Sequence, residues 1–475
     1  MKIFKIKIIS FILLFPLCNG YSQWTQNIRL TYDTNESVTS YNNARCIAAS
    51  GNTIHVVWMD NRVSYNDIFY KRSTDCGNTW ESDFRITNNP WSTYPCIAVS
   101  GLNVYTSWNY GGEIYLRISS DGGINWGDNI RVTNFTQPSS YSSIAVSGTF
   151  IHVTWVDFRN QHEEIFYKHS SDNGLTWGPD ISLSYNFLNY TWYSSVASSD
   201  SIVHVVWGYN NSGGRIFYNR SSDRGFNWSN AIMLKSTQSS FPSVSSSGPY
   251  VHAVWEDWRD GNVEIYYKRS TNAGLSWETD VRLTNDTSWS EYPNVTASGS
   301  AVHVVWYDRR NGNYEVYYRC SKDNGASWEP EVRLTNDVHS SRCPSVAACG
   351  PAVHVVWTDD RDGNEEIYYS QNPTGNIVSL KNTNKSIPQY FSLYQNYPNP
   401  FNPVTIINYQ LPVSNHVKLA IYDVMGREIA VLVNEHLNPG SYEAEWDGSN
   451  YPSGVYFYKL ITAEYTETRK MVLVK

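Results

Sequence analysis

The pentapeptide Ile54-His55-Val56-Val57-Trp58 decides the fold, because it returns along the chain with small changes. The later copies end at Trp108, Trp155, Trp207, Trp255, Trp306 and Trp357. Their spacing of about 50 residues is typical of blades and solenoid units, and β-branched and aromatic residues favour strands. The sequence therefore predicts an array of β repeats.

Each repeat divides into four short strands. A run of small residues, as at 344–348, suits the crowded strand nearest to a propeller axis. The Val-His-Val-Val-Trp strand follows and ends in a hairpin marked by pairs such as Asp260-Gly261. A third strand, as at 264–269, precedes a fourth that carries Arg-Leu-Thr, as at 282–284.

The copies of the four strands are unequal in number. Strands one to three occur seven times, whereas only six copies of strand four follow them. The missing copy stands at the other end, where residues 24–31 read Trp-Thr-Gln-Asn-Ile-Arg-Leu-Thr. Closing the ring removes exposed sheet edges. We therefore predict an all-β, seven-bladed β-propeller. Its N-terminal strand, residues 24–31, should close the last blade by pairing with strand three around residues 365–370.

The first residues predict export. A basic leader with Lys2, Lys5 and Lys7 precedes an apolar run at 8–17, and small residues follow, so residues 1–22 are expected to be a signal peptide. A lipid anchor on Cys18 is the alternative. No later stretch has the length and apolar character of a transmembrane helix. The net charge of -8 without a basic run argues against nucleic acid as a partner.

Cysteine usage leaves two readings open. The mature chain keeps Cys46, Cys76, Cys96, Cys320, Cys343 and Cys349. Export permits disulfides, but the spacing selects no pairing, and buried thiols are the alternative. Because no Cys-x-x-Cys or Cys/His cluster occurs, we expect no metal site and no cofactor.

Between strands three and four lies a recurring Ser-x-Asp-x-Gly-x-x-Trp motif. Its aspartates are Asp75, Asp121, Asp172, Asp223 and Asp323, and one copy has Asn272 instead. This motif is the Asp box, and residues 23–370 resemble the sialidase (BNR-repeat) superfamily of propellers. We expect a structural role for these aspartates, in which the carboxylate binds turn amides. The resemblance places the Asp boxes on the face away from the family's active site.

The resemblance implies a possible hydrolase, but it carries over no catalytic residue. A sialidase uses three arginines, a tyrosine–glutamate pair and an aspartate. Arg85 resembles the first of these arginines, but it lies in strand four, where Arg-Leu-Thr recurs, and the proline of the family motif is missing. The family is also usually six-bladed. The catalytic residues are thus unknown, and whether the chain is an enzyme stays open.

A second recurring pattern lies at the hairpin between strands two and three. It pairs Asp60 with Arg62, Asp157 with Arg159, Asp257 with Arg259, Asp308 with Arg310 and Asp359 with Arg361. One reading is a ring of arginines for anionic sugars. We favour an ion pair within each blade, with the arginine also reaching the glutamate that opens strand three (Glu164, Glu264, Glu315, Glu366). The recurring strand-two histidines are read as structural.

Four tryptophans of this part of the chain fall outside the repeat pattern. Trp91, Trp192, Trp258 and Trp289 lie in predicted loops on one face, near Tyr94, Tyr193 and Tyr292. Exposed rings on one face predict a platform for sugars or for a protein partner. Packing between loops is the alternative.

The character of the chain changes after Tyr369. Residues 371–390 read as a polar linker, and 391–475 closely resemble the type A C-terminal sorting domain of type IX secretion cargo, a small Ig-like β-sandwich. The resemblance implies the type IX machinery as a partner and places Trp446 in a core. We expect a secreted or cell-surface propeller that binds glycans or surface proteins, with an extracellular sialidase-type glycoside hydrolase as the alternative.

Overall fold

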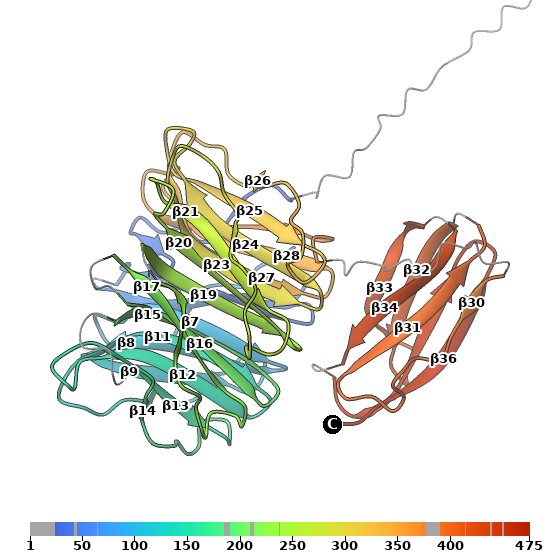
Figure 1. Cartoon of the computed structure of the whole chain (residues 1–475), viewed down its shortest axis with the longest axis horizontal. Helices are drawn as coiled ribbons and strands as arrows, with labels where there is room; N and C mark the ends of the chain where they lie inside the picture. Colours follow the sequence, from blue (N-terminus) through green and yellow to red (C-terminus); the bar gives the residue numbers. More distant parts are fainter. Residues whose placement is uncertain are drawn as a thin grey trace, which may run out of the picture.

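The computed structural model describes most of the chain after the predicted signal peptide. The described residues are 24–41, 45–63, 65–184, 191–209, 213–236, 238–376, 390–413, 415–437, 439–448 and 451–475. In this part of the chain every named element is a β-strand (Figure 1). The predicted signal peptide and residues 377–389 of the predicted linker lie outside it.

In the described residues, β1 to β29 form seven antiparallel sheets. Sheet 1 contains β2 (Ser37–Val38), β3 (Ile47–Ser50), β4 (Thr53–Asp60), β5 (Asp67–Ser73) and β6 (Phe84–Arg85). Sheet 2 contains β7 (Thr93–Ser100), β8 (Asn103–Tyr110), β9 (Glu113–Ser119) and β10 (Ile130–Arg131). Sheet 3 contains β11 (Ser139–Ser147), β12 (Phe150–Asp157), β13 (Glu164–Ser170) and β14 (Ile181–Ser182). Sheets 4 and 5 contain β15 (Thr191–Ser199), β16 (Ile202–Tyr209), β17 (Arg215–Ser221), β18 (Ile232–Lys235); and β19 (Ser239–Ser247), β20 (Tyr250–Asp257), β21 (Glu264–Ser270), β22 (Val281–Arg282). Sheets 6 and 7 contain β23 (Ser290–Ser298), β24 (Ala301–Asp308), β25 (Glu315–Ser321), β26 (Val332–Arg333); and β27 (Ser341–Cys349), β28 (Ala352–Asp359), β29 (Glu366–Asn372) with β1 (Ile28–Arg29).

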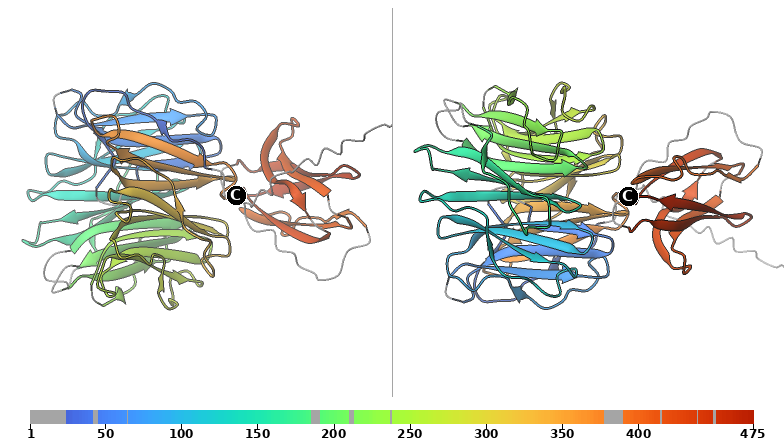
Figure 2. Two further views of the ribbon diagram at one scale, coloured as in Figure 1. Left: turned by 90° about the horizontal axis from the view of Figure 1, so that it is seen from above. Right: turned by 90° about the horizontal axis from the view of Figure 1, so that it is seen from below.

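The sheets follow one another in a closed cycle of contacts. The small-residue strand of each sheet contacts that of the next, from β3 through β7, β11, β15, β19 and β23 to β27, and β27 returns to β3. These innermost strands surround an axial cavity of about 190 Å³. The arrangement is that of a β-propeller (Figure 2).

The N-terminal strand belongs to the last sheet. β1 pairs antiparallel with β29, with Ile28 opposite Tyr369. Leu30, directly after β1, is only 2% exposed, and the Arg29 guanidinium lies 2.6 Å from the Glu366 carboxylate. Sheet 7 is thus built from both ends of the repeat region. β29 runs to Asn372, so the ordered strand passes the predicted boundary at 370 because it continues to pair with β28.

A repeated contact joins each sheet to the next. His55 of β4 bonds the Tyr70 hydroxyl at 2.7 Å, and the Tyr70 ring packs edge-on against Trp126 of the next sheet at 5.0 Å. Gly123, in the same Asp box as Trp126, has a φ of +86°, and a Cβ there would lie 1.9 Å from the Tyr70 oxygen. The same His–Tyr hydrogen bond recurs at His152, His204, His252, His303 and His354. The strand-two histidines therefore anchor the tyrosines that lock adjacent sheets, as expected for structural residues.

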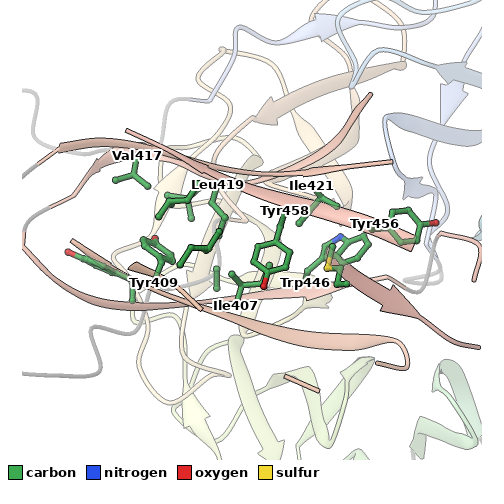
Figure 3. Packing of buried hydrophobic residues seen from close by; sticks show 14 of the residues in the cluster. Ile407, Tyr409, Val417, Leu419, Ile421, Trp446, Tyr456 and Tyr458 are labelled. Atoms are coloured by element: carbon green, nitrogen blue, oxygen red, sulfur yellow. The ribbon is translucent and has the colours of Figure 1, made fainter. Parts of the chain in front are cut away.

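The remaining strands form a second body with its own core. One sheet contains β30 (Ser392–Leu393), β31 (Val404–Leu411) and β34 (Gly440–Asp447); the other contains β33 (Glu428–Leu437), β32 (Asn415–Tyr422), β35 (Gly454–Ile461) and β36 (Thr466–Leu473). Ile407, Leu419 and Tyr458 are fully buried in one apolar cluster (Figure 3). Trp446 is 3% exposed in the same cluster, so the prediction that it is a core residue is confirmed.

Candidate functional site

The Asp boxes hold the turns between strands three and four. The Asp172 Oδ1 atom accepts hydrogen bonds from the Thr176 amide and the Ser170 hydroxyl, both at 2.8 Å. The Gly174 amide donates to the Ser170 hydroxyl at 2.8 Å. Hydrogen bonds, first of all from the Thr176 hydroxyl, lower the pKa of Asp172 to about 2. The side chains of Asp75, Asp121, Asp223 and Asp323 make corresponding bonds.

The hairpin arginines each bind the aspartate two residues earlier. Arg159 Nε donates to Asp157 at 2.8 Å, and its Nη1 lies 2.8 Å from Asp180, just before strand four. Matching pairs join Arg62 to Asp60, Arg259 to Asp257, Arg310 to Asp308 and Arg361 to Asp359. The ion pair favoured from the sequence is therefore present in five of the seven sheets, sheets 1, 3, 5, 6 and 7.

The second half of that expectation is wrong, because strand-four arginines pair with Glu264, Glu315 and Glu366, and the Ser182 hydroxyl of strand four donates to Glu164. Arg282 lies 2.5 Å from Glu264, and Arg333 lies 2.7 Å from Glu315. The register explains this pairing. Arg282 stands opposite Tyr266, two residues beyond Glu264 and therefore on the same face of the sheet. Arg85 of strand four likewise pairs with Asp67 at 2.6 Å, as its place in the repeat suggests.

The face opposite the Asp boxes carries a belt of aromatic rings. Ser139 at the start of β11 stands opposite Asp157 at the hairpin end of β12, whereas Ser170 of the Asp box stands opposite Ile151 at the other end. Tyr94, Tyr141, Tyr193, Phe241 and Tyr292 each occupy a bulge near the start of an innermost strand, with φ between 44° and 56°. Neighbouring rings in this aromatic belt lie 4.7, 5.0, 4.8 and 4.2 Å apart in that order.

The seven residues singled out from the sequence do not form one patch. Tyr94, Tyr193 and Tyr292 belong to the aromatic belt, whereas the Trp91 ring packs against Tyr65 in a tilted arrangement with ring centroids 4.7 Å apart. Trp192 lies within β15 rather than in a loop, since the bulge allows its chain to keep pairing with Gly208. Trp91, Trp192, Trp258 and Trp289 are 63, 42, 36 and 50% exposed.

Two cavities open beside Trp192. The larger, of about 520 Å³, lies between sheets 4 and 5 and is bounded by Trp192, Tyr193, Tyr209, Phe241 and Trp258, with Gly208, Gly213, Gly214, Gln238, Ser239 and Ser240 completing its wall. The smaller, of about 200 Å³, lies between sheets 3 and 4 and includes Tyr141, Phe158 and Glu163. The Trp192 indole N–H donates to Glu163 at 3.2 Å. The structure therefore brings Trp192, Tyr193 and Trp258 together, whereas Trp91 and Trp289 line neither cavity.

The larger cavity exists where the repeat departs from its pattern. Gly208 takes the place of Val156 and Glu256 in the neighbouring repeats, and Tyr209 takes the place of the hairpin aspartate. Gly214 lies so close to Ser239 that a Cβ would meet its carbonyl oxygen at 2.4 Å. Gly214 thus allows the backbones of sheets 4 and 5 to approach closely at one side of the cavity, and aromatic rings bound the rest of it.

A buried carboxyl group is hydrogen-bonded to Ser240 of the cavity wall. Glu256 is 2% exposed and accepts hydrogen bonds from the Tyr292 amide at 2.7 Å and the Ser240 hydroxyl at 3.1 Å. Burial raises the pKa of Glu256 to about 8, and nearby Glu291 adds to the effect. The group is therefore largely a neutral acid at pH 7. Sequence analysis missed it, because a glutamate between strand-two Trp255 and Asp257 has no distinguishing motif.

Sequence analysis also missed Tyr141 and Phe241 of the aromatic belt. Their signal was available: the third residue of the innermost strand is aromatic in Thr-Trp-Tyr, Ser-Ser-Tyr and Ser-Ser-Phe at 191, 139 and 239.

Among the described residues, no helix has the length and apolar character needed to cross a membrane. In the same part of the chain, no cluster of three or more His, Cys, Asp or Glu side chains could hold a metal ion.

Comparison with known families identifies the C-terminal region. Residues 395–475 match the family described as the secretion system C-terminal sorting domain. The protein is therefore exported by type IX secretion, to the cell surface or the medium. No curated protein matches the chain.

Solved structures resemble the chain at low sequence identity. A polysaccharide lyase, an ulvan lyase, has a TM-score of 0.51 at 11% identity and covers 72% of this chain and 95% of its own. A fungal alcohol oxidase in complex with copper has a TM-score of 0.54 at 6% identity and covers 96% and 100%. The Trypanosoma rangeli sialidase has a TM-score of 0.43 at 11% identity and covers 80% and 84%. The first two likenesses concern the fold alone.

Proposed function

We propose that the mature protein is an exported, seven-bladed β-propeller that binds glycans in the larger cavity between sheets 4 and 5. The observation that carries this proposal is the cavity itself, about 520 Å³ in volume, with Trp192 and Trp258 both in its wall. Small-molecule sites commonly have volumes of about 300–1,000 Å³ and combine apolar walls with a few polar groups.

The chemistry of the cavity suits a sugar ring. The C–H faces of a sugar stack on aromatic rings, and Trp192 and Trp258 keep exposed fractions of 42 and 36% for such contacts. Gln238 and Ser240 supply polar groups around the aromatic surface. The concave shape favours a glycan over a flat protein surface as the ligand.

The proposed division of the chain follows from the same elements. Residues 1–22 are the signal peptide, 23–370 with the end of β29 are the propeller, 371–390 contain the linker, and 391–475 are an Ig-like sorting domain. The Asp boxes, with Asp75, Asp121, Asp172, Asp223 and Asp323, stabilise turns on the face opposite the glycan. The aromatic belt supports the cavity from the axial side.

A glycan array tests the proposal directly. The exported mature protein is screened against neutral and acidic oligosaccharides, and Trp192→Ala and Trp258→Ala are screened beside it. Both variants are expected to lose the glycans that the wild type binds, while Trp289→Ala, an exposed tryptophan outside the cavity, keeps them. A fluorogenic sialoside assayed in parallel reports hydrolysis. Turnover of that substrate would favour the hydrolase, and equal loss with Trp289→Ala would favour a wider platform.

A further inference from the structure

Two of the six mature cysteines lie at the seam where the ring of sheets closes. Cys76 is in the Asp box of sheet 1, and Cys349 ends β27 of sheet 7. Both are half-buried and both are thiols in this structure. The seam between these sheets is the one that the N-terminal strand also closes, since β1 completes sheet 7.

Both cysteines contact the same turn, residues 51–52 between β3 and β4. The Cys349 thiol lies 3.1 Å from the Gly51 carbonyl oxygen, so this side chain of sheet 7 reaches across to sheet 1. The Cys76 amide donates to the Asn52 carbonyl at 2.9 Å. Burial, followed by the neighbouring Cys76 thiol, raises the pKa of Cys349 to about 11, which also reflects the closeness of the two sulfurs.

Equivalent positions in other repeats show where the Cys76 side chain is directed. Cys76 has a φ of +58°, and Asn173 and Arg224 occupy the same Asp-box position with φ of +58° and +63°. The Asn173 amide oxygen accepts a bond from Tyr105 of the preceding sheet at 2.9 Å. The Arg224 guanidinium lies 4.8 Å from the Phe150 ring, also in the preceding sheet. For sheet 1 the preceding sheet is sheet 7, where Cys349 lies.

We propose that Cys76 and Cys349 form a disulfide bond that fastens the closing seam of the exported protein. A protein or small-molecule disulfide outside the cytoplasm serves as the oxidant. One cysteine thiolate attacks the oxidant to give a mixed disulfide, and the second cysteine resolves it. The Cys76–Cys349 bond forms, the two thiols lose two protons and two electrons, and the oxidant's disulfide is reduced to two thiol groups. Because burial holds both groups as thiols after folding, the bond forms while the seam is closing.

The other cysteines have surroundings of a different kind. Cys46, Cys96 and Cys343 are at most 6% exposed, and each lies in or next to an innermost strand. Burial is the first cause that raises the pKa of Cys46 and of Cys96, and the neighbouring Cys96 and Cys343 thiols add to the effect at Cys46. They behave as small apolar core residues. Cys320, in β25, is 8% exposed. The pair at the seam is distinguished from these four cysteines because both of its members are only half-buried and both contact residues 51–52.

Peptide mapping of the full exported chain tests the bond. Free thiols are blocked with iodoacetamide during unfolding without reductant, and the protein is digested with trypsin. We expect residues 73–85 linked to 343–361, with a mass two hydrogens below the sum of the two peptides. Because the second peptide also contains Cys343, Cys343→Ser is the control and should keep the link, whereas Cys349→Ser should abolish it.

The thermal midpoint gives an independent readout. The Cys76→Ser/Cys349→Ser variant and the reduced wild type should both unfold about 5 °C or more below the oxidised wild type, because the bond restricts the unfolded chain. Reduction should leave the midpoint of the double variant unchanged. Alkylation of all six cysteines without reductant, or a link that survives Cys349→Ser, would overturn the proposal.

Discussion

Replacing Glu256 by Gln tests the protonation state of the buried carboxyl group that is bonded to Ser240 of the larger cavity. Glutamine keeps the shape and the two hydrogen-bond partners, the Tyr292 amide and the Ser240 hydroxyl, but it cannot ionise. The groups near Glu256 are the Glu291 carboxyl and the phenols of Tyr193, Tyr292 and Tyr307. The variant therefore removes an acid that these surroundings hold in its neutral form.

The sign of the pH dependence follows from the direction of the shift. The pKa of Glu256 is about 8 in the folded protein and 4.5 as its ordinary value. A group whose pKa is raised by folding stabilises the fold most below pH 4.5, and this contribution is lost as the pH rises to about 8. The difference corresponds to about 5 kcal/mol in the free energy of unfolding. The gain in the free energy of unfolding of Glu256→Gln over the wild type should be only about 1 kcal/mol near pH 5 and should approach the full difference near pH 9.

Urea unfolding followed by tryptophan fluorescence measures this difference between pH 5 and pH 9. The signal reports the propeller, because only Trp446 of the 19 tryptophans belongs to the sorting domain. Glu329→Gln, at a glutamate whose side chain is 52% exposed, is the matched control and should follow the wild type at every pH. Parallel curves for the wild type and Glu256→Gln would refute the reasoning, because the carboxyl group would then be ionised without penalty.

Three further outcomes follow from the contacts described above. Leu30→Ala, at a side chain 2% exposed beside β1, should lower the free energy of unfolding by about 2–5 kcal/mol, and an unchanged urea midpoint would contradict the closure. Deleting 24–31 should destabilise the propeller far more than deleting 391–475. Asp172→Ala should lower the thermal midpoint while the folded fraction binds glycan as the wild type does, because the residue holds a turn on the opposite face; weaker binding without lost stability would argue against this role. Truncation after Ser392 should leave the protein in the periplasm, as cell fractionation would show, since the sorting domain is gone; normal appearance of the truncated protein in the medium would contradict the sorting assignment.

The sequence predicts the strands well because each carries a local signal. The Val-His-Val-Val-Trp run, the Asp-Gly hairpins and the Asp boxes fix where strands begin and end. The unequal strand count even places residues 24–31 beside β29, where Ile28 pairs with Tyr369. These features depend on residues that are close together in one repeat, and their recurrence along the chain makes them easy to recognise in the sequence.

The site depends on contacts between repeats, which local patterns do not encode. The bulge residues Tyr141 and Phe241 adopt positive φ without a glycine to mark the position, so the aromatic belt emerges only when sheets stand side by side. The partner of Glu264 depends on the register of strand four, which brings Arg282 to it rather than the hairpin Arg259. The cavity likewise lies where Gly208 and Tyr209 depart from the repeat, and such substitutions do not by themselves indicate a cavity in the sequence.

Titration of the protein with a glycan selected on the array tests the central claim most directly. Calorimetry gives Kd for the wild type, Trp192→Ala, Trp258→Ala and the control Trp289→Ala. Loss of a stacked ring in the cavity should weaken binding by about 1–3 kcal/mol, a factor of about 5 to 150 in Kd, with thermal midpoints close to that of the wild type. Trp289→Ala should bind as the wild type does. Unchanged Kd values for both Trp192→Ala and Trp258→Ala would contradict the assignment of the glycan to the cavity between sheets 4 and 5.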